Sequence, residues 1–292
     1  MKVCIKCNEP FISEDWVCPR CGCSPQKKNG YLSFLQETEK AEQFFDSGFY
    51  PQLAALETNN FWFRFRNKLL KWAIHNHFPN AVHFLEVGSG TGFVLSGLRD
   101  EFPGMKITGS DIYPQGLDYA KERVPDAAFL NMDACNIPFE KEFDLIGLFD
   151  ILEHIQDDQK VLNQVGKAVH ESGGIILTVP QYKWIWSAQD NAAFHVRRYS
   201  RNELRSKVEA AGFNVVYMTS FITLLLPLLV FSRLATNFIE RSDAPHDWTR
   251  ELRLHPFINA AFETVCNLEL LFLKKSVRMP VGSSLLCIGV KE

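Results

Sequence analysis

Short apolar segments alternate with segments of helical periodicity between residues 82 and 179. The apolar segments are predicted strands, namely Val82–Val87, Lys106–Ser110, Ala128–Leu130, Phe143–Phe149 and Gly174–Val179. Helices are predicted between them near Phe93–Glu101, Gln115–Arg123 and Asp157–Val169. Alternation of this kind predicts a parallel sheet with helices on both faces. The expected fold is therefore a doubly wound, Rossmann-like α/β sheet.

The end of the chain departs from this alternation of strands and helices. Phe213–Thr219 and Ser284–Val290 alternate like a sixth and a seventh strand, and a helix is predicted before them at Tyr199–Ala211. Roughly sixty residues separate these two strands, which is too long for a hairpin loop. This insert, at about residues 220–280, contains the apolar run Phe221–Phe231 and a segment of helical spacing, Pro256–Lys275. We therefore predict seven strands with a helical insert between the last two.

The chain before the first strand divides into two parts. Residues 1–30 hold a cysteine-rich segment and a polar linker. Residues 31–80 are predicted to be a helical cap, with helices near Leu32–Phe45 and Asn60–His77. Residues 81–292 then form the α/β core.

Four cysteines near the amino terminus have the spacing of paired metal-binding turns: Cys4, Cys7, Cys18 and Cys21. Each Cys-x-x-Cys pair aims two sulfurs at one point, and four thiolates form the tetrahedron that zinc accepts. Four sulfur ligands leave no position for water, so the predicted zinc is structural. Cys23 could replace Cys21 as the fourth ligand, and free or redox-active thiols are the alternative to a metal site. The segment resembles a zinc ribbon.

A glycine-rich turn follows the first predicted strand. Its residues Gly88, Ser89, Gly90 and Gly92 lie where ligands bind in a doubly wound sheet, beyond the carboxyl ends of the strands. Glycines let the backbone approach a nucleoside that side chains would block. Such a turn is a weak signal alone, because nicotinamide and flavin enzymes use one too.

Acidic residues stand at four of the predicted strand ends: Glu86, Asp111, Asp133 and Asp150. Asp111 suits the hydroxyls of a ribose and Asp133 the amine of an adenine. Glu86 suits the ammonium group of a methionine, and Asp150 is expected to border the methionine side of the site. Four carboxylates suit the cationic sulfonium of S-adenosylmethionine better than an anionic dinucleotide.

These residues resemble the motifs of class I S-adenosylmethionine-dependent methyltransferases, in Leu85–Gly92, Asp111, Asp133 and Phe149–His154. The Leu-Glu-His element at 152–154 is similar to that of the quinone-biosynthesis and small-molecule branches. The similarity covers residues 60 to 292 and leaves out the cysteine cluster. It implies that the seventh strand runs antiparallel.

The same resemblance implies further cofactor contacts. Ile112 and Ala134 are expected beside the acids, and Arg66 is expected to meet the cofactor carboxylate. Trp62, on the aromatic helix, would cover the pocket. The alternative for this helix is packing on the sheet.

Two histidines are candidates for a catalytic base. His154 follows the fourth strand, and His195 lies in a polar loop after the fifth. A hydroxyl acceptor needs a base for its proton, and histidine titrates near neutral pH. A hydrogen-bonded structural role is the alternative for each.

The expected reaction is methyl transfer to the oxygen or carbon of a small molecule, which could be lipid-like or saccharide-linked. The run Phe221–Phe231 is too short for a membrane-spanning helix, which takes about 20 residues. It could instead touch a membrane surface, form a homodimer contact or cover an apolar acceptor. The formal net charge of −3 gives no overall attraction to nucleic acid.

Three other functions stay open. A nicotinamide-dependent oxidoreductase expects two residues before its third glycine, where this turn has one. A nucleic-acid or protein methyltransferase guided by the zinc ribbon, and a non-catalytic binding protein that retains the fold, are the others. The first residues lack an apolar run of signal-peptide length, so a cytoplasmic protein, peripheral to a membrane at most, is expected.

Overall fold

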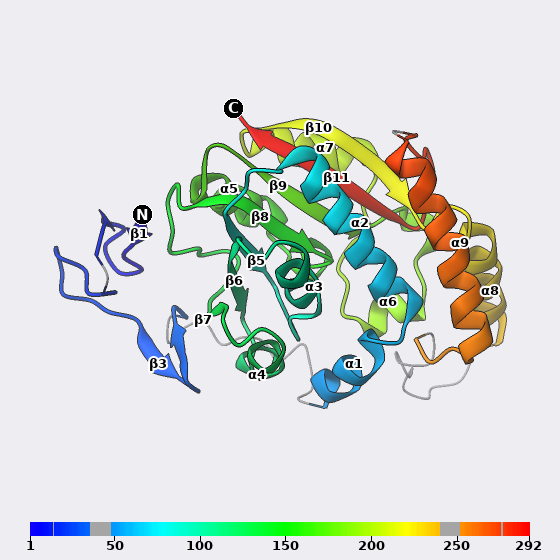
Figure 1. The fold of residues 1–292 in the computed structure, drawn as a ribbon, viewed down its shortest axis with the longest axis horizontal. Coiled ribbons are helices and arrows are strands. Elements are labelled where there is room, and N and C mark those ends of the chain that lie inside the picture. Colours follow the sequence, from blue (N-terminus) through cyan, green and yellow to red (C-terminus); the bar gives the residue numbers. More distant parts are fainter. Residues whose placement is uncertain (14, 36–47, 240–251, 276) are drawn as a thin grey trace.

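The computed structural model describes residues 1–13, 15–35, 48–239, 252–275 and 277–292 (Figure 1). Its strands are β1 (Lys2–Val3), β2 (Pro10–Phe11), β3 (Gln26–Lys28), β4 (Tyr31–Ser33), β5 (His83–Val87), β6 (Lys106–Asp111), β7 (Ala128–Asn131), β8 (Phe143–Phe149), β9 (Val169–Pro180), β10 (Phe213–Phe221) and β11 (Ser284–Lys291). Its helices are α1 (Phe49–Glu57), α2 (Phe61–His77), α3 (Phe93–Glu101), α4 (Pro114–Arg123), α5 (Asp158–Ala168), α6 (Ala188–Ala192), α7 (Arg201–Ala210), α8 (Leu226–Ile239) and α9 (Pro256–Lys274), with short 3-10 helices η1 (Leu152–His154) and η2 (Lys183–Ile185).

The described residues form one large sheet with the strand order β10-β11-β9-β8-β5-β6-β7-β4-β3, while β1 and β2 pair separately. Strands β5 to β9 are parallel, and β11 runs antiparallel to both of its neighbours. This confirms the predicted doubly wound sheet with an antiparallel seventh strand. The helices α8 and α9 occupy the predicted insert between β10 and β11.

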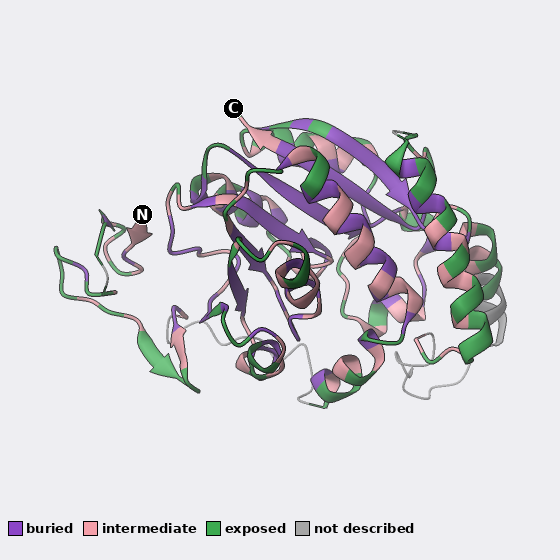
Figure 2. Cartoon of the chain, viewed as in Figure 1, coloured by how far each residue is buried: buried purple, intermediate pink, exposed green. Residues whose placement is uncertain are grey.

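Helices cover both faces of the sheet, whose central strands are buried (Figure 2). One core lies between the sheet and the helices α5 and α7, where Val165 and Val208 are fully buried. The other lies under α2, α3, α4 and α9 and includes Leu69, Leu95 and Cys266. Burial on both faces is what a parallel sheet requires, because its crossover helices cover both sides. The chain crosses over on either side of β5, so the carboxyl ends of β5, β6 and β8 meet at a topological switch point.

The sheet extends one hairpin beyond the prediction. Tyr31–Ser33 forms β4, which pairs parallel with β7 and antiparallel with β3. The helix predicted from Leu32 is therefore wrong at its start, and residues 36–45 of that prediction lie outside the described residues. Leu32 pairs with Leu130 instead, and Phe34 is buried in the core. Pairing with the open edge of β7 outweighs a local helical spacing.

The cysteine-rich segment packs against the α/β domain. The backbone N–H of Val3 donates to the carbonyl of Pro138 at 3.0 Å. The Trp16 ring lies 4.5 Å from that of Phe34 and 5.4 Å from that of Phe139, both edge-on. Aromatic contacts thus join the segment to the core beside β4 and β8.

Candidate functional site

The glycine turn between β5 and α3 exposes bare backbone at the carboxyl end of the sheet. Gly88 has a φ of 76°, and a Cβ there would lie 2.2 Å from Cδ1 of Ile151. Only glycine fits such a position without strain. At Gly90, with a φ of 50°, a Cβ would meet no atom within 4 Å among the described residues. The turn therefore leaves room for a ligand on the side of Gly90.

Asp111, at the end of β6, is held against this turn. Its carboxylate accepts the backbone N–H of Gly90 and that of Tyr113, both at 2.9 Å. Burial raises the pKa of Asp111 to about 6, although the backbone donors act in the opposite direction. Each carboxylate oxygen keeps lone-pair capacity for a further donor. A ribose diol beside Gly90 would supply such donors.

Glu86, at the end of β5, is a buried acid. Within the described part of the chain its Oε2 atom has no hydrogen-bond partner. Burial raises the pKa of Glu86 well above its usual range, and the Arg66 charge only partly opposes this. An unpaired buried carboxyl is costly unless a cationic or donating group reaches it. The ammonium group of S-adenosylmethionine is a partner of the right charge.

The loop after β7 carries Asp133 and Ala134. Asp133 is half-buried and its Oδ1 accepts the backbone N–H of Cys135 at 2.8 Å, while Ala134 is buried. Asn131, at the end of β7, donates its side-chain amide to the carbonyls of Asp111 at 3.1 Å and Ile112 at 2.9 Å. These bonds fix the loop after β6 to the loop after β7, so the predicted ribose and adenine acids belong to one connected edge.

Arg66 reaches from α2 to the end of β8. Its Nη1 atom lies 2.6 Å from Oδ2 of Asp150, which also accepts from the hydroxyl of Thr178 at 3.1 Å. The guanidinium lies 4.6 Å from the Trp62 ring centroid. Asp150 adopts a left-handed φ of 56°, which is unusual for a residue other than glycine. Such backbone strain gathers at ligand sites.

A buried network that sequence reasoning missed ties α1 to the glycine turn. Glu57 accepts the hydroxyl of Thr91 at 2.6 Å and pairs with Arg123 at 2.6 Å. Arg123 also donates to the carbonyl of Thr91 at 3.1 Å. Nothing in the sequence separates Glu57 from an ordinary helical acid, because its partners come from the glycine turn and from α4.

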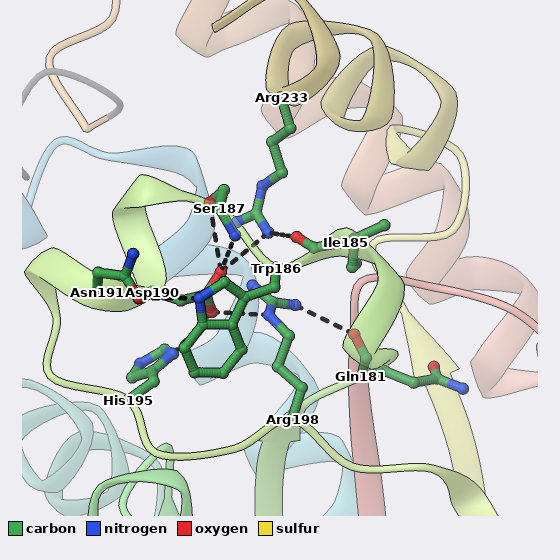
Figure 3. A network of polar contacts seen from close by, with 9 residues as sticks. All are labelled: Gln181, Ile185, Trp186, Ser187, Asp190, Asn191, His195, Arg198 and Arg233. Carbon is green, nitrogen blue, oxygen red and sulfur yellow. Dashed lines mark hydrogen bonds and ion pairs between the residues drawn. The ribbon is translucent and has the colours of Figure 1, made fainter. Parts of the chain in front are cut away.

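The second predicted histidine, His195, lies beside a buried acid that the sequence analysis did not select. Its Nδ1 atom is 2.9 Å from Oδ1 of Asp190 (Figure 3). A carboxylate only accepts, so Nδ1 carries the hydrogen, and in the neutral form of the ring Nε2 has the lone pair. The signal in the sequence is Ser187 three residues before Asp190, a capping-box spacing that the structure bears out.

Asp190 is the centre of a charged network (Figure 3). Arg198 Nε lies 2.7 Å from Oδ1, Arg233 of α8 lies 3.5 Å from Oδ2, and the backbone N–H of Ser187 donates at 2.9 Å. Burial alone would raise the pKa of Asp190, but the His195 hydrogen bond and the two arginine charges outweigh it and lower the pKa. Asp190 therefore stays ionised and holds His195 in place.

His154 and Glu153, in η1, face the same loop. The His154 and His195 rings lie 4.8 Å apart, edge-on. Burial, together with the nearby His195, lowers the pKa of His154 to about 3, so its ring is neutral at neutral pH. Glu153 is buried, and its backbone carbonyl accepts the N–H of Val196 at 2.8 Å. This bond joins the His195 loop to the segment after β8.

The same three side chains could hold a cation. One donor atom from each of Glu153, His154 and His195 lies within 4.8 Å of the others. Both predicted base candidates therefore meet in one cluster next to Asp150, whose charge also acts on Glu153.

The four predicted cysteine ligands also come together. Their sulfurs lie within 4.8 Å of one another, and the Sγ atoms of Cys4 and Cys21, and of Cys7 and Cys18, are 3.6 Å apart. Zinc–sulfur bonds of about 2.3 Å place two tetrahedral thiolates about 3.8 Å apart. Cys23 stands outside this four-sulfur group, and its carbonyl accepts the N–H of Cys18 at 2.8 Å. The donor set fits zinc.

The chain matches the family described as "Methyltransferase domain" over residues 55–218. The chain belongs to this family. It contains a class I S-adenosylmethionine-dependent methyltransferase domain, which confirms the expected family and supports S-adenosylmethionine as the cofactor.

Curated relatives match about a third of the methyltransferase sequence. A demethylmenaquinone methyltransferase of Thermotoga maritima is 29% identical over 99 residues, which are 34% of this chain and 43% of that protein. A malonyl-[acyl-carrier protein] O-methyltransferase of Ilyobacter polytropus is 33% identical over 96 residues, which are 32% of this chain and 36% of that protein. The matches thus span less than half of these two relatives.

Solved structures agree in fold across more of the methyltransferase. Phosphoethanolamine N-methyltransferase 2 of Haemonchus contortus, in complex with S-adenosylmethionine, superposes with a TM-score of 0.56 at 17% identity, covering 86% of this chain and 58% of that one. A possible histamine N-methyltransferase of Thermotoga maritima superposes with a TM-score of 0.51 at 16% identity, covering 84% of this chain and 96% of that one. Identities this low support the fold alone.

Proposed function

We propose that this methyltransferase transfers the methyl group of S-adenosylmethionine to a hydroxyl oxygen of a small, largely apolar molecule. The observation that carries this proposal is the Asp190–His195 pair at 2.9 Å, set in a loop next to the end of β8. A base with an oriented lone pair is useful for an oxygen acceptor, whose proton must leave, and adds little at an amine that is already neutral.

The cofactor end of the site has matching chemistry. Glu86 would hold the ammonium group, Asp111 the ribose hydroxyls and Asp133 the adenine amine, with Ile112 and Ala134 beside them. The open space at Gly90 and the unpartnered Glu86 oxygen, as far as the structure is described, both fit this group. Once bound, S-adenosylmethionine supplies a methyl group that is electrophilic because of its sulfonium.

The residues of this chain align the acceptor and take its proton. His195 would accept the hydroxyl proton at Nε2, and Asp190 would stabilise the imidazolium that forms. His154, whose ring is neutral, lies beside this ring with the two centroids 4.8 Å apart. Methyl transfer is an in-line displacement, so orientation and the exclusion of water supply much of the rate increase.

An apolar acceptor is favoured by the insert and by the relatives. Exposed apolar side chains of α8, such as Leu228 and Phe231, belong to the helix that supplies Arg233 to the Asp190 network. One matched relative is named for demethylmenaquinone, and another is named for O-methylation of an acyl-carrier-protein substrate. None of these features favours a nucleic-acid substrate.

The test is a search for the product. Purified protein is incubated with a metabolite extract and S-adenosylmethionine carrying a deuterated methyl group, and the labelled products are identified by mass spectrometry. An O-methylated apolar product supports the proposal. Label found only on nitrogen, on protein or on nucleic acid would contradict it.

We also propose that Cys4, Cys7, Cys18 and Cys21 hold one structural zinc ion. Four thiolates complete its coordination, so the ion would stabilise the amino-terminal segment without touching the acceptor.

A further inference from the structure

The helix α9 is the longer of the two helices that the structure describes in the insert, and it has two different faces. It is also long and apolar enough to be a candidate membrane span by length and composition, yet only 22% of its most apolar window is buried. Cys266, Leu270 and Leu273 face inward and are buried in the core under α2. The ring of Phe262 lies 5.3 Å from that of Phe61 of α2. One face of α9 is therefore fixed to the domain.

The charged and amide side chains in the middle of α9 also turn toward the protein. Glu263 pairs with Arg64 and with Lys68 of α2. Glu269 is buried and accepts the backbone N–H of Thr223 at 2.8 Å. Asn267 accepts from Lys68 at 2.9 Å. Both acidic residues of α9, Glu263 and Glu269, therefore have partners within the protein.

The opposite face of α9 is an apolar stripe. Its exposed apolar members are Phe257, Ala261, Leu268, Leu271 and Phe272, and the exposed Thr264 among them donates its hydroxyl back to the carbonyl of Ala260 at 2.9 Å. Apart from the adjacent pair Leu271 and Phe272, these positions are spaced by three, four or seven residues or by sums of these, so they share one side of an α-helix. Phe257 is 82% exposed and Leu271 is 56% exposed. Green segments recur along α9 in Figure 2.

Cations stand where this stripe ends. Lys274, Lys275 and Arg278 are exposed at the carboxyl end of α9, and Arg253 is exposed before its first turn. The helix α8, at the same end of the view in Figure 1, adds exposed Leu228 and Phe231. The surface thus combines apolar side chains with positive charge and lacks a free acid on α9, although the whole chain has a formal net charge of −3.

We propose that the outer face of α9, with Leu228 and Phe231 of α8, docks on the surface of an anionic lipid bilayer. An apolar stripe flanked by lysine and arginine is the pattern of a helix that lies in the membrane interface, its cations at the headgroups. The inward contacts of Glu263 and Glu269 keep α9 on the domain, so it lies along the membrane without crossing it. A second copy of this chain would bring the same cations together, which opposes a dimer through this face.

The surface is also joined to the candidate base. Arg233 of α8 donates to the carbonyl of Ile185 and lies 3.5 Å from Asp190 (Figure 3). A bilayer under α8 would therefore lie next to the loop that holds His195, so an apolar acceptor could come from the membrane. The docking itself does not depend on the proposed reaction.

Flotation of the full-length protein with lipid vesicles tests the docking. We expect binding to vesicles of phosphatidylcholine with phosphatidylglycerol, little binding to phosphatidylcholine alone, and weakening as salt is added. Replacing Lys274 and Lys275 by glutamine should lower the affinity roughly 30-fold, because each of the two cations near an anionic surface contributes about fivefold to binding. The double variant F257S/L268S should lose binding to both kinds of vesicle.

Matched variants keep the test specific. Lys27 and Lys28 are an exposed lysine pair on β3, and Val82 is an exposed apolar residue before β5. K27Q/K28Q and V82S should bind vesicles like the unchanged protein. Circular dichroism and binding of S-adenosylmethionine show that each variant is folded. Equal binding by K274Q/K275Q and K27Q/K28Q would overturn the proposal. So would a lipid-free dimer that F257S/L268S dissociates, with no vesicle binding by the unchanged protein.

Discussion

The backbone N–H of Gly90 donates to the carboxylate of Asp111 at 2.9 Å, so the glycine turn after β5 and the acid after β6 form one unit. This bond explains why the two sequence signals belong together. The turn supplies open space and the acid supplies acceptors on its border. The site residues contributed by α1 and α2, in contrast, reach this edge from another layer of the fold.

We predict that the affinity for S-adenosylmethionine falls as the pH drops through about 6. Burial raises the pKa of Asp111 to about 6 in the free protein. Above that pH the group is a carboxylate that accepts from the ribose hydroxyls, and below it the added proton removes part of this capacity. Isothermal titration across this range measures the effect.

The Asp111→Asn variant is the control for this pH dependence. It should bind S-adenosylmethionine about tenfold or more weakly than the unchanged protein, since a hydrogen bond to a charged group contributes about 1.5–3 kcal/mol. The dependence of its affinity on pH near 6 should be weaker than that of the unchanged protein, and what remains belongs to Glu86, whose pKa burial also raises. If the affinity of the variant depends on pH as steeply as that of the unchanged protein, the titrating group is not Asp111.

Gly88→Ala should weaken cofactor binding and lower the stability of the fold. The left-handed φ of 76° costs alanine about 1–2 kcal/mol, and the new Cβ would also lie 2.2 Å from Cδ1 of Ile151. The double variant G88A/I151A should recover the part that comes from this clash. Gly104→Ala is the matched control, because a Cβ there meets nothing within 4 Å. Thermal unfolding with and without S-adenosylmethionine distinguishes these contributions.

The seven core strands could be predicted because each depends on a local pattern. A buried parallel strand is a continuous apolar run, as in Phe143–Phe149, and its bounds match those of β8. The acids at 86, 111, 133 and 150 could be selected because the carboxyl ends of parallel strands share one edge. The cap of α7 was equally local, since the side chain of Ser200 accepts the N–H of Glu203 at 3.2 Å.

The remaining features depend on contacts between distant segments. The hairpin of β3 and β4 has only three residues in each strand, and pairing with β7 makes a strand of Tyr31–Ser33. The partner of His195 could not be chosen among nearby acids without the fold. The apolar run Phe221–Phe231 also divides, because Phe221 ends β10 and is buried whereas Phe231 is exposed. The inner face of α9 is as apolar as its outer face, so the composition of the helix does not predict which side is exposed.

One zinc ion per chain is expected by elemental analysis of the purified protein. Cys18→Ser should lose it, while Cys23→Ser should retain it because Cys23 lies outside the four-sulfur cluster. Loss of the metal should also release Trp16 from Phe34 and Phe139, which costs about 1–3 kcal/mol for the two aromatic pairs. Urea unfolding of the two variants measures this difference. Zinc bound equally by both would contradict the ligand assignment.

Replacing His195 is the most direct test of the proposed chemistry. His195→Ala should lower kcat by about 10²- to 10⁴-fold for a hydroxyl acceptor, the usual contribution of a general base. Binding of S-adenosylmethionine should stay the same, because His195 has no part in the cofactor contacts. His170→Ala is the matched control, since His170 is exposed at the start of β9.

Asp190→Asn separates the base from its support. The amide can donate to Nδ1, which would favour the tautomer that carries the proton on Nε2, so kcat should fall while the KM for the acceptor changes little. The assays are run with a chelator and repeated with added magnesium. Because the donor atoms of Glu153, His154 and His195 lie within 4.8 Å of one another, the two possible roles of His195 predict opposite results. If the unchanged protein is fully active in the chelator and both His195→Ala and Asp190→Asn lose activity, His195 acts as a base. If the unchanged protein is active only with the added cation, His195 is a metal ligand instead.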